Sequence, residues 1–171
     1  MKSIVVLAMH GAPPRDFPRP ELAEFMSLHA RLEAAAVSHS PALESRYEEL
    51  EQKMRDWPRS RQNDPFFASS QEIATALERA SGYEVKLGFN EFCAPGLDAA
   101  LESAVSSGAA RVFVVTPMMT RGGEHSEKDI AQAVNKAQEK YQRVKFVYAW
   151  PFDTSEVAGF LANQIKKFEN V

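Results

Sequence analysis

Short apolar runs alternate with segments of helical periodicity along most of this chain. The first run, Ser3 to Met9, is continuously apolar and rich in β-branched residues, which is typical of a strand covered on both faces of a parallel sheet. Three further short runs are rich in Val and Phe: Glu84 to Phe89, Arg111 to Thr116 and Val144 to Tyr148. We predict one strand for each of the four runs.

Helical patterns follow the last three predicted strands. Between Pro95 and Gly108, apolar residues recur at helical spacing, so we predict a helix there. A second helix is predicted to be capped by Ser126, and a third begins near Asp153. Because strands alternate with helices, the fold class is α/β, with a parallel sheet and helices on both of its faces.

The segment between the first two strands is too long for a single crossover helix. Seven of the chain's prolines lie between Pro13 and Pro65, and no Gly occurs from Ala12 to Ser81, which favours helical pieces over a flexible linker. We therefore predict a helical insertion or lid at about residues 14–68 after the first strand. The rest of residues 1–171 is expected to belong to the same single domain.

Three helices fit between the first two strands. The first two are predicted to form a hairpin that turns at Ser40-Pro41. The third is predicted to start at a capping box of Ser69 with Glu72 and to end at Gly82, and it is the regular crossover helix.

Composition and charge limit the kinds of partner that the protein can bind and indicate its cellular location. Twenty Lys and Arg against 23 Asp and Glu leave a net charge of -3, so no global positive field exists to attract nucleic acid or an anionic membrane. The longest apolar stretch, Ile4 to Met9, is far too short to span a bilayer, and no secretory signal is recognisable. Cys93 is the single cysteine, which excludes an intramolecular disulfide. A cytoplasmic location is the expectation.

Candidate chemistry gathers just after the predicted strands, since ligands of open parallel sheets bind beyond the carboxyl ends of the strands. His10 follows the first strand, Glu91 the second and His125 the third. Imidazole and carboxylate groups together suit a divalent first-row metal with positions left open. From topology alone, each residue also fits an ordinary loop residue or helix cap.

The two remaining histidines and the cysteine are predicted to have no part in the metal site. His29 and His39 lie on or beside the predicted hairpin and fit core packing or simple exposure, so neither is assigned to the metal. Cys93 is interpreted as a small buried hydrophobe.

Several familiar sites lack their required residues. Gly11 is followed by prolines without N–H groups, which disfavours a nucleotide phosphate loop, and no Gly-x-Ser-x-Gly turn exists for a serine hydrolase. A phosphohistidine phosphatase would carry Arg before His10, where this chain has Met9.

Two motifs carry a family resemblance. MHGAPP ends the first strand, and the block GFNEFCAPGLDAALESAVSSGAARVFVVTPMMTRGGEHSEKDI spans the next two. With these motifs the chain resembles the class II chelatases of the CbiX and SirB type, which insert metal into sirohydrochlorin for cobalamin or siroheme synthesis. The resemblance implies a flavodoxin-like, doubly wound four-stranded sheet and a homodimer. It also implies that His10 and His125 bind the metal and that Glu91 joins the metal or accepts a proton.

The expected function is therefore ATP-independent insertion of Co²⁺ or Fe²⁺ into sirohydrochlorin or a related tetrapyrrole. Ni²⁺ accepts the same ligand types. The metal is a substrate, and no permanently bound cofactor is expected. The carboxylates of the macrocycle call for cationic partners, for which Arg15, Arg55, Arg59 and Arg121 are the candidates, with Arg61 as a further one.

One departure from the family pattern leaves the choice of tetrapyrrole open. Ala12-Pro13-Pro14 follows Gly11, where many family members have Ser and then Arg or Asp. Two alternative functions also remain: a tetrapyrrole- or metal-binding carrier without turnover and, more distantly, a phosphatase-like hydrolase using His10.

Overall fold

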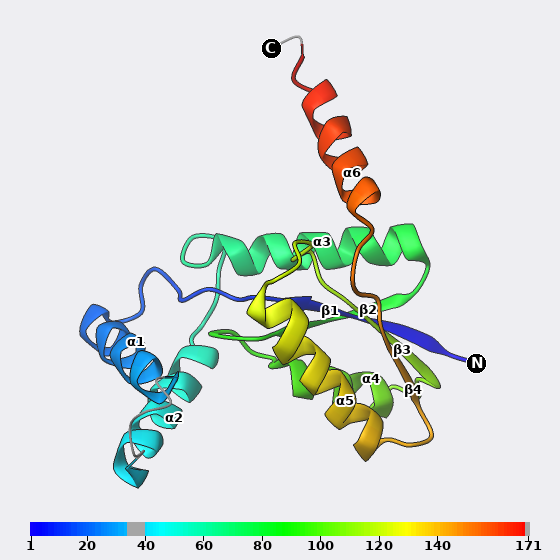
Figure 1. Ribbon diagram of the computed structural model, residues 1–171. Helices are drawn as coiled ribbons and strands as arrows, with labels where there is room; N and C mark the ends of the chain where they lie inside the picture. Colours follow the sequence, from blue (N-terminus) through cyan, green and yellow to red (C-terminus); the bar gives the residue numbers. More distant parts are fainter. Residues whose placement is uncertain (34–39, 170–171) are drawn as a thin grey trace.

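Four parallel strands form a single sheet in the computed structural model, which describes residues 1–33 and 40–169. The strands are β1 (Ser3–Met9), β2 (Glu84–Phe89), β3 (Arg111–Val115) and β4 (Lys145–Tyr148). Their order in the sheet is β2-β1-β3-β4, the flavodoxin-like order, so the predicted fold class is confirmed (Figure 1). Strands β3 and β4 each differ from the predicted range by a single residue.

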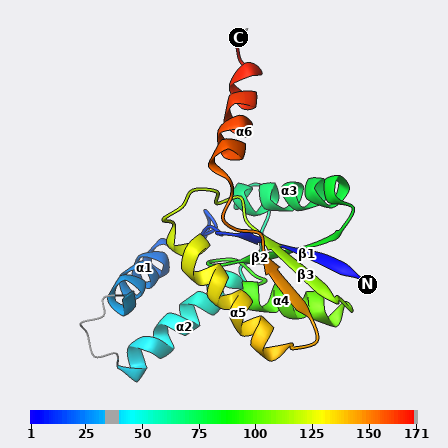
Figure 2. The ribbon, with the colours of Figure 1, turned by 45° about the vertical axis from the view of Figure 1, so that its right-hand side comes forward.

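Each face of the sheet is covered by different helices, as Figure 2 shows. On one face, alternate β1 side chains such as Ile4 and Val6 pack with α4 (Leu97–Ser106) and α5 (Ile130–Lys140). On the other face, Leu7 and Met9 belong to a second apolar cluster that includes α3 (Pro65–Ser81). The buried β1 is thus the centre of the core, and its carboxyl end lies between those of β2 and β3.

The predicted insertion folds as a helical pair, α1 (Arg19–Glu33) and α2 (Pro41–Arg55), ahead of α3. Ion pairs join the two helices, with Arg46 Nη2 2.7 Å from Glu24 Oε2 and Lys53 Nζ 2.6 Å from Glu21 Oε2. The sequence predicts that the hairpin turns at Ser40-Pro41. Residues 34–39, which precede Ser40 and include His39, lie outside the described residues. Within them, Ser40 caps α2 and Pro41 is the first residue of that helix.

The predicted capping box of α3 is wrong. The cap lies five residues earlier, at Asp64, and the helix begins at Pro65; the buried carboxylate of Asp64 accepts a hydrogen bond of 2.8 Å from the backbone N–H of Phe67. Asp64 before Pro65 is the stronger start, because Pro suits the first helical turn and Asp satisfies an orphan donor. The predicted end is confirmed, since Gly82 adopts a positive φ of 72° after the last turn.

The predicted cap at Ser126 is also wrong. One turn of π-helix, His125–Asp129, precedes α5, and the Ser126 hydroxyl donates to the Gly123 carbonyl at 3.1 Å instead of capping the helix. Ile130 donates its backbone N–H to the carbonyl of His125, which is the i to i+5 bond of a π-turn. Such turns are frequent at functional sites.

Helix α6 (Thr154–Lys166) projects away from the rest of the chain (Figure 1). It begins next to Asp153 as predicted, and the Asp153 carboxylate caps it by accepting from the backbone N–H of Ser155 at 2.8 Å. None of its residues is buried, and Phe160 and Ile165 are 59% and 66% exposed. Among the described residues, no helix is both long enough and apolar enough to cross a membrane.

Candidate metal centre

His10, Glu91 and His125 converge at the carboxyl edge of the sheet. One ligand atom from each residue lies within 4.8 Å of the others, and all three side chains are half-buried. The topology explains this meeting, because β1 lies between β2 and β3 and the three residues follow those strands. The structure therefore brings together the three residues that the sequence predicted for the metal.

The spacing within this centre leaves room for an ion. His10 Nε2 lies 3.8 Å from Glu91 Oε2, and the His10 and His125 rings meet edge to face with centroids 4.5 Å apart. His10 Nδ1 donates to the Gly11 carbonyl at 2.9 Å, so Nε2 is the ring nitrogen that faces Glu91. Since metal–nitrogen and metal–oxygen bonds are about 2.0–2.2 Å, a cation fits between such groups.

Asp129 orients His125. Its Oδ2 lies 2.6 Å from His125 Nδ1, which leaves Nε2 of that ring available as a ligand. The π-turn supports the pair, and the Tyr148 hydroxyl donates to the Ser126 carbonyl at 2.7 Å. Burial raises the pKa of Tyr148 to about 12, so this hydroxyl stays a donor at neutral pH. Sequence reasoning gave Asp129 no role at the site, although its spacing four residues after His125 was a signal.

The loops that carry His10 and Glu91 are bonded directly to each other. The backbone N–H of Glu91 donates to the His10 carbonyl at 2.9 Å. Gly11 has a φ of 99°, and a Cβ atom built there would lie 1.9 Å from the Glu91 carbonyl oxygen. Only glycine fits this position, for both reasons. The close approach sets the separation between the imidazole and the carboxylate.

Arg59 has a structural position, which contradicts its predicted role in substrate binding. Its side chain is only 6% exposed and forms an ion pair with Asp64. The guanidinium also donates to the carbonyls of Ala12, Phe92 and Met54. Arg59 therefore ties the loop after β1 to the loop after β2, and it has no open face for a ligand.

Cys93 lies in the same buried region. Its Sγ is 3.7 Å from Asp64 Oδ2, and burial raises the pKa of the thiol. The thiol therefore stays protonated at neutral pH, which agrees with its interpretation as a buried hydrophobe.

The remaining arginines differ in position. Arg55 is half-buried, donates to Glu51 and to the carbonyls of Asn90 and Cys93, and lines a cavity beside the metal centre. Arg15 and Arg121 are exposed on the loops after β1 and β3, where their role in substrate binding stays a prediction. Arg61 is exposed and pairs with Glu72.

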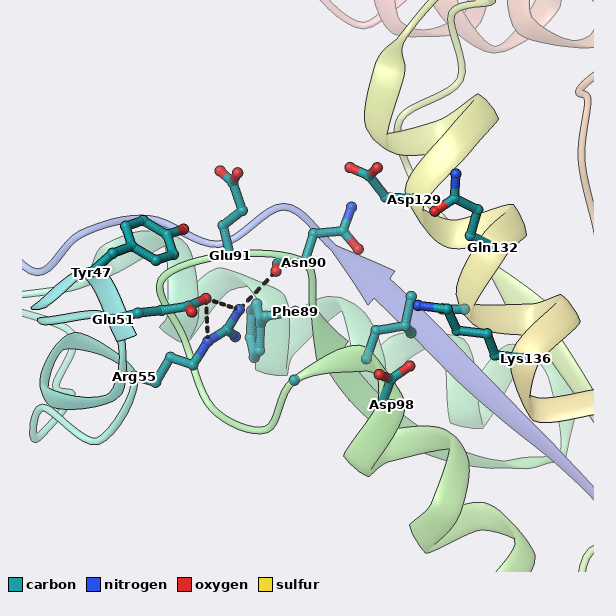
Figure 3. Close-up of a pocket in the computed structure, with 13 residues that line it drawn as sticks. Tyr47, Glu51, Arg55, Phe89, Asn90, Glu91, Asp98, Asp129, Gln132 and Lys136 are labelled. Atoms are coloured by element: carbon teal, nitrogen blue, oxygen red, sulfur yellow. Dashed lines mark hydrogen bonds and ion pairs between the residues drawn. The ribbon is translucent and has the colours of Figure 1, made fainter. Parts of the chain in front are cut away.

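A cavity of about 360 Å³ adjoins the centre, between α2, the end of β2, α4 and α5 (Figure 3). Glu91 and Asp129 both line it, so it opens onto the residues that hold or orient the proposed metal ligands. Its wall carries two cationic side chains, Arg55 and Lys136, and four carboxylates, those of Glu51, Glu91, Asp98 and Asp129. Because Arg55 is paired with Glu51, the cavity is polar and has an excess of acidic groups.

His29 is a residue that the sequence analysis assigned to packing or exposure and that the structure brings to the site. From α1, its Nε2 lies 3.9 Å from Glu91 Oε1. It shares an apolar stripe with Phe25 and Leu22 in the sequence, and only the fold of the insertion reveals that this stripe ends beside Glu91.

Comparison with known proteins gives matches to chelatases. A 68-residue segment is 29% identical to a sirohydrochlorin ferrochelatase of Priestia megaterium and covers 40% of this chain and 25% of the relative. A 70-residue segment is 38% identical to a sirohydrochlorin cobaltochelatase of the same organism and covers 41% of this chain and 22% of the relative. The chain thus aligns with only about a quarter of each curated relative.

Among solved structures, SirB from Bacillus subtilis with Fe³⁺ has the same fold. The similarity covers all of this chain and 49% of that chain, with a TM-score of 0.50 and 16% sequence identity. The CbiX family model matches residues 61–167, which is more than half of the chain and includes Glu91 and His125. On this match, the chain belongs to the CbiX family.

Proposed function

We propose that this protein is a metal chelatase that inserts Co²⁺ or Fe²⁺ into sirohydrochlorin or a related tetrapyrrole. The observation that carries the proposal is the convergence of His10, Glu91 and His125 beside a polar cavity. Membership of the CbiX family and the names of the curated relatives support it.

The residues suit a metal that is held and then released. Two imidazoles and one carboxylate form an incomplete coordination shell, which leaves positions for the nitrogens of the macrocycle. Insertion also releases two pyrrole N–H protons. Glu91 can accept one of them at a carboxylate oxygen once that oxygen leaves the metal, and solvent at the open edge takes the other.

Exposed cationic side chains near the centre support an anionic macrocycle. Arg15 and Arg121 are exposed on the loops after β1 and β3, and Lys136 lies in the wall of the cavity. We infer that Arg15, Arg121 and Lys136 bind substrate carboxylates, because charged pairs of this kind fix orientation at a rim. The protein is proposed to act in the cytoplasm, as its lone cysteine suggests.

An anaerobic absorbance time course tests the function. Purified protein is mixed with sirohydrochlorin and with Co²⁺ or Fe²⁺ in turn, and each reaction is compared with a reaction without protein. Repeated turnovers to the metallated product would support a chelatase and rank the metals. Stoichiometric binding without product would support the carrier instead, and release of phosphate from simple esters would support the phosphatase.

Asp129→Asn is expected to weaken Co²⁺ binding by about 10–100-fold, the usual effect of removing a partner that orients a ligating histidine. The amide keeps the size of the side chain but lacks the charge that holds the His125 tautomer. Isothermal titration with Co²⁺ measures the effect. Glu127→Gln, which changes an exposed acid on the same π-turn, is the control, and equal affinities in the two variants would contradict the role of Asp129.

A homodimer is also proposed, with α6 of each copy packed on the other copy. Phe160, Leu161 and Ile165 are all more than half exposed on α6. On the sheet face that carries α3, Phe113 and Val147 are only half-buried, because among the described helices α3 packs there mainly on β2 rather than on β3 or β4. Each copy thus offers one apolar helix and one apolar surface. A two-fold axis between two copies can place α6 of each copy on the apolar surface of the other.

Ile165→Glu combined with Phe160→Glu is expected to convert the dimer to a monomer, because each copy would have to bury two charges. Light scattering after size-exclusion chromatography measures the mass. Asn163→Asp adds charge at a polar position of the same helix and is expected to leave the dimer intact. A monomeric wild-type protein would overturn the proposed exchange.

A further inference from the structure

The carboxylate of Glu91 lies between two histidines from distant parts of the chain. Its Oε2 is 3.8 Å from His10 Nε2, and its Oε1 is 3.9 Å from His29 Nε2. Both separations are too long for a hydrogen bond. Each side of the carboxylate therefore has a gap that faces an imidazole nitrogen.

The ring of His29 is held in this direction by α1 and α2. Its Nδ1 is 3.3 Å from the Tyr47 hydroxyl, and the ring stacks on Phe25 and on Tyr47 with centroids 6.1 and 6.0 Å away. One ring nitrogen is thus bonded to an outer partner while the other faces a carboxylate, which is how metal-ligating histidines are commonly supported. His29 is half-buried, with 28% of its side chain exposed.

The distance to Glu91 suits a shared cation. An ion bound tetrahedrally by one imidazole nitrogen and one carboxylate oxygen holds them about 3.4 Å apart. A closure of about half an ångström therefore brings His29 and Oε1 to that separation. His29 lies outside the set of ligand atoms that are within 4.8 Å of one another, so an ion at this place is distinct from one held by His10 and His125.

We propose that His29 and Oε1 of Glu91 form an outer position for the divalent cation, next to the inner position of His10, His125 and Oε2. The ligand set selects first-row divalent ions, and water completes the shell. The ion passes from the outer to the inner position by exchanging one oxygen of the shared carboxylate for the other. This delivery role rests on the proposed chelatase function, whereas the binding of the cation does not.

The outer position assigns a role to the helical pair of the insertion, α1 and α2. Residues 19–33 of α1 lie outside the part of the chain that matches the CbiX family model, residues 61–167. His29 and Tyr47 are both supplied by the helical pair, and Tyr47 also lines the cavity beside Glu91. The pair therefore adds a cation-loading position to a centre that the remainder of the chain already builds.

Binding of Co²⁺ alone tests the outer position without any tetrapyrrole. A variant with His10→Ala and His125→Ala is titrated with Co²⁺, and ligand-field absorption is recorded together with equilibrium dialysis. We expect this double variant to retain one Co²⁺ site with a histidine nitrogen signature. Adding His29→Ala is expected to weaken that site at least tenfold and to remove the signature.

The matched control adds Met26→Ala, an exposed residue on the same helix, to the double variant and is expected to change nothing. Circular dichroism checks that every variant is folded. Equal Co²⁺ affinity and spectra with and without His29 would overturn the outer position, whatever the wild-type activity is. A wild-type protein that inserts no metal would overturn the proposed function while leaving this binding result valid.

Kinetics test the delivery role. In the otherwise wild-type protein, His29→Ala is expected to raise the KM for Co²⁺ at least tenfold and to leave kcat within twofold, because the inner position is intact. A fall in kcat with an unchanged KM for Co²⁺ would contradict loading through His29.

Discussion

Metal insertion is expected to be lost when either His10 or His125 is replaced by Ala. Each substitution removes one of two imidazoles from a set that has only one other ligand, Glu91, so the metal is no longer presented to the macrocycle. We expect kcat/KM to fall by more than about 100-fold, beyond the effect of losing an outer partner. Initial rates with sirohydrochlorin and Co²⁺ measure the loss.

The fold is expected to survive both substitutions, because the two side chains are half-buried at the edge of the sheet and not in either apolar cluster. Urea unfolding checks this. Lys128→Ala changes an exposed residue on the π-turn that carries His125 and is expected to keep wild-type rates. Full activity in either histidine variant would remove that histidine from the proposed mechanism.

Arg59→Ala is expected to destabilise the protein by about 3–5 kcal/mol, the usual cost of breaking a buried ion pair. The substitution leaves the carboxylate of Asp64, which is 1% exposed, without its charged partner. It also removes the donors that hold the carbonyls of Ala12 and Phe92. Urea unfolding followed by circular dichroism measures the free energy of unfolding.

A surface pair provides the comparison for Arg59. Arg61→Ala breaks the exposed pair with Glu72 and is expected to cost less than about 1 kcal/mol. Replacing Arg59 by Met together with Asp64→Asn is expected to recover part of the lost stability, because no unpaired charge remains buried and the amide oxygen still accepts from the backbone N–H of Phe67. A cost for Arg59→Ala as small as that for Arg61→Ala would show that the buried network does not hold the loops.

Local sequence patterns were sufficient for the strands and for most helices. Apolar runs such as Ser3 to Met9 are buried on both faces of the sheet, so their length and composition identify them directly. The start of α3 was predicted wrongly because two polar signals compete within a few residues, and Asp64 before Pro65 is stronger than Ser69 with Glu72. The π-turn at His125 had no sequence signature that would separate it from an ordinary helix start.

The sequence by itself determined the α/β class, the helical insertion and the placement of His10, Glu91 and His125 at the carboxyl edge of the sheet. Residues that follow parallel strands share that edge, and the strand order, with β1 between β2 and β3, then brings the three side chains together. The tertiary structure alone decided the positions of Arg59 and His29. Whether a charged side chain is buried or faces a ligand depends on how the insertion packs against the sheet, and such contacts between distant residues leave no periodic pattern in the chain.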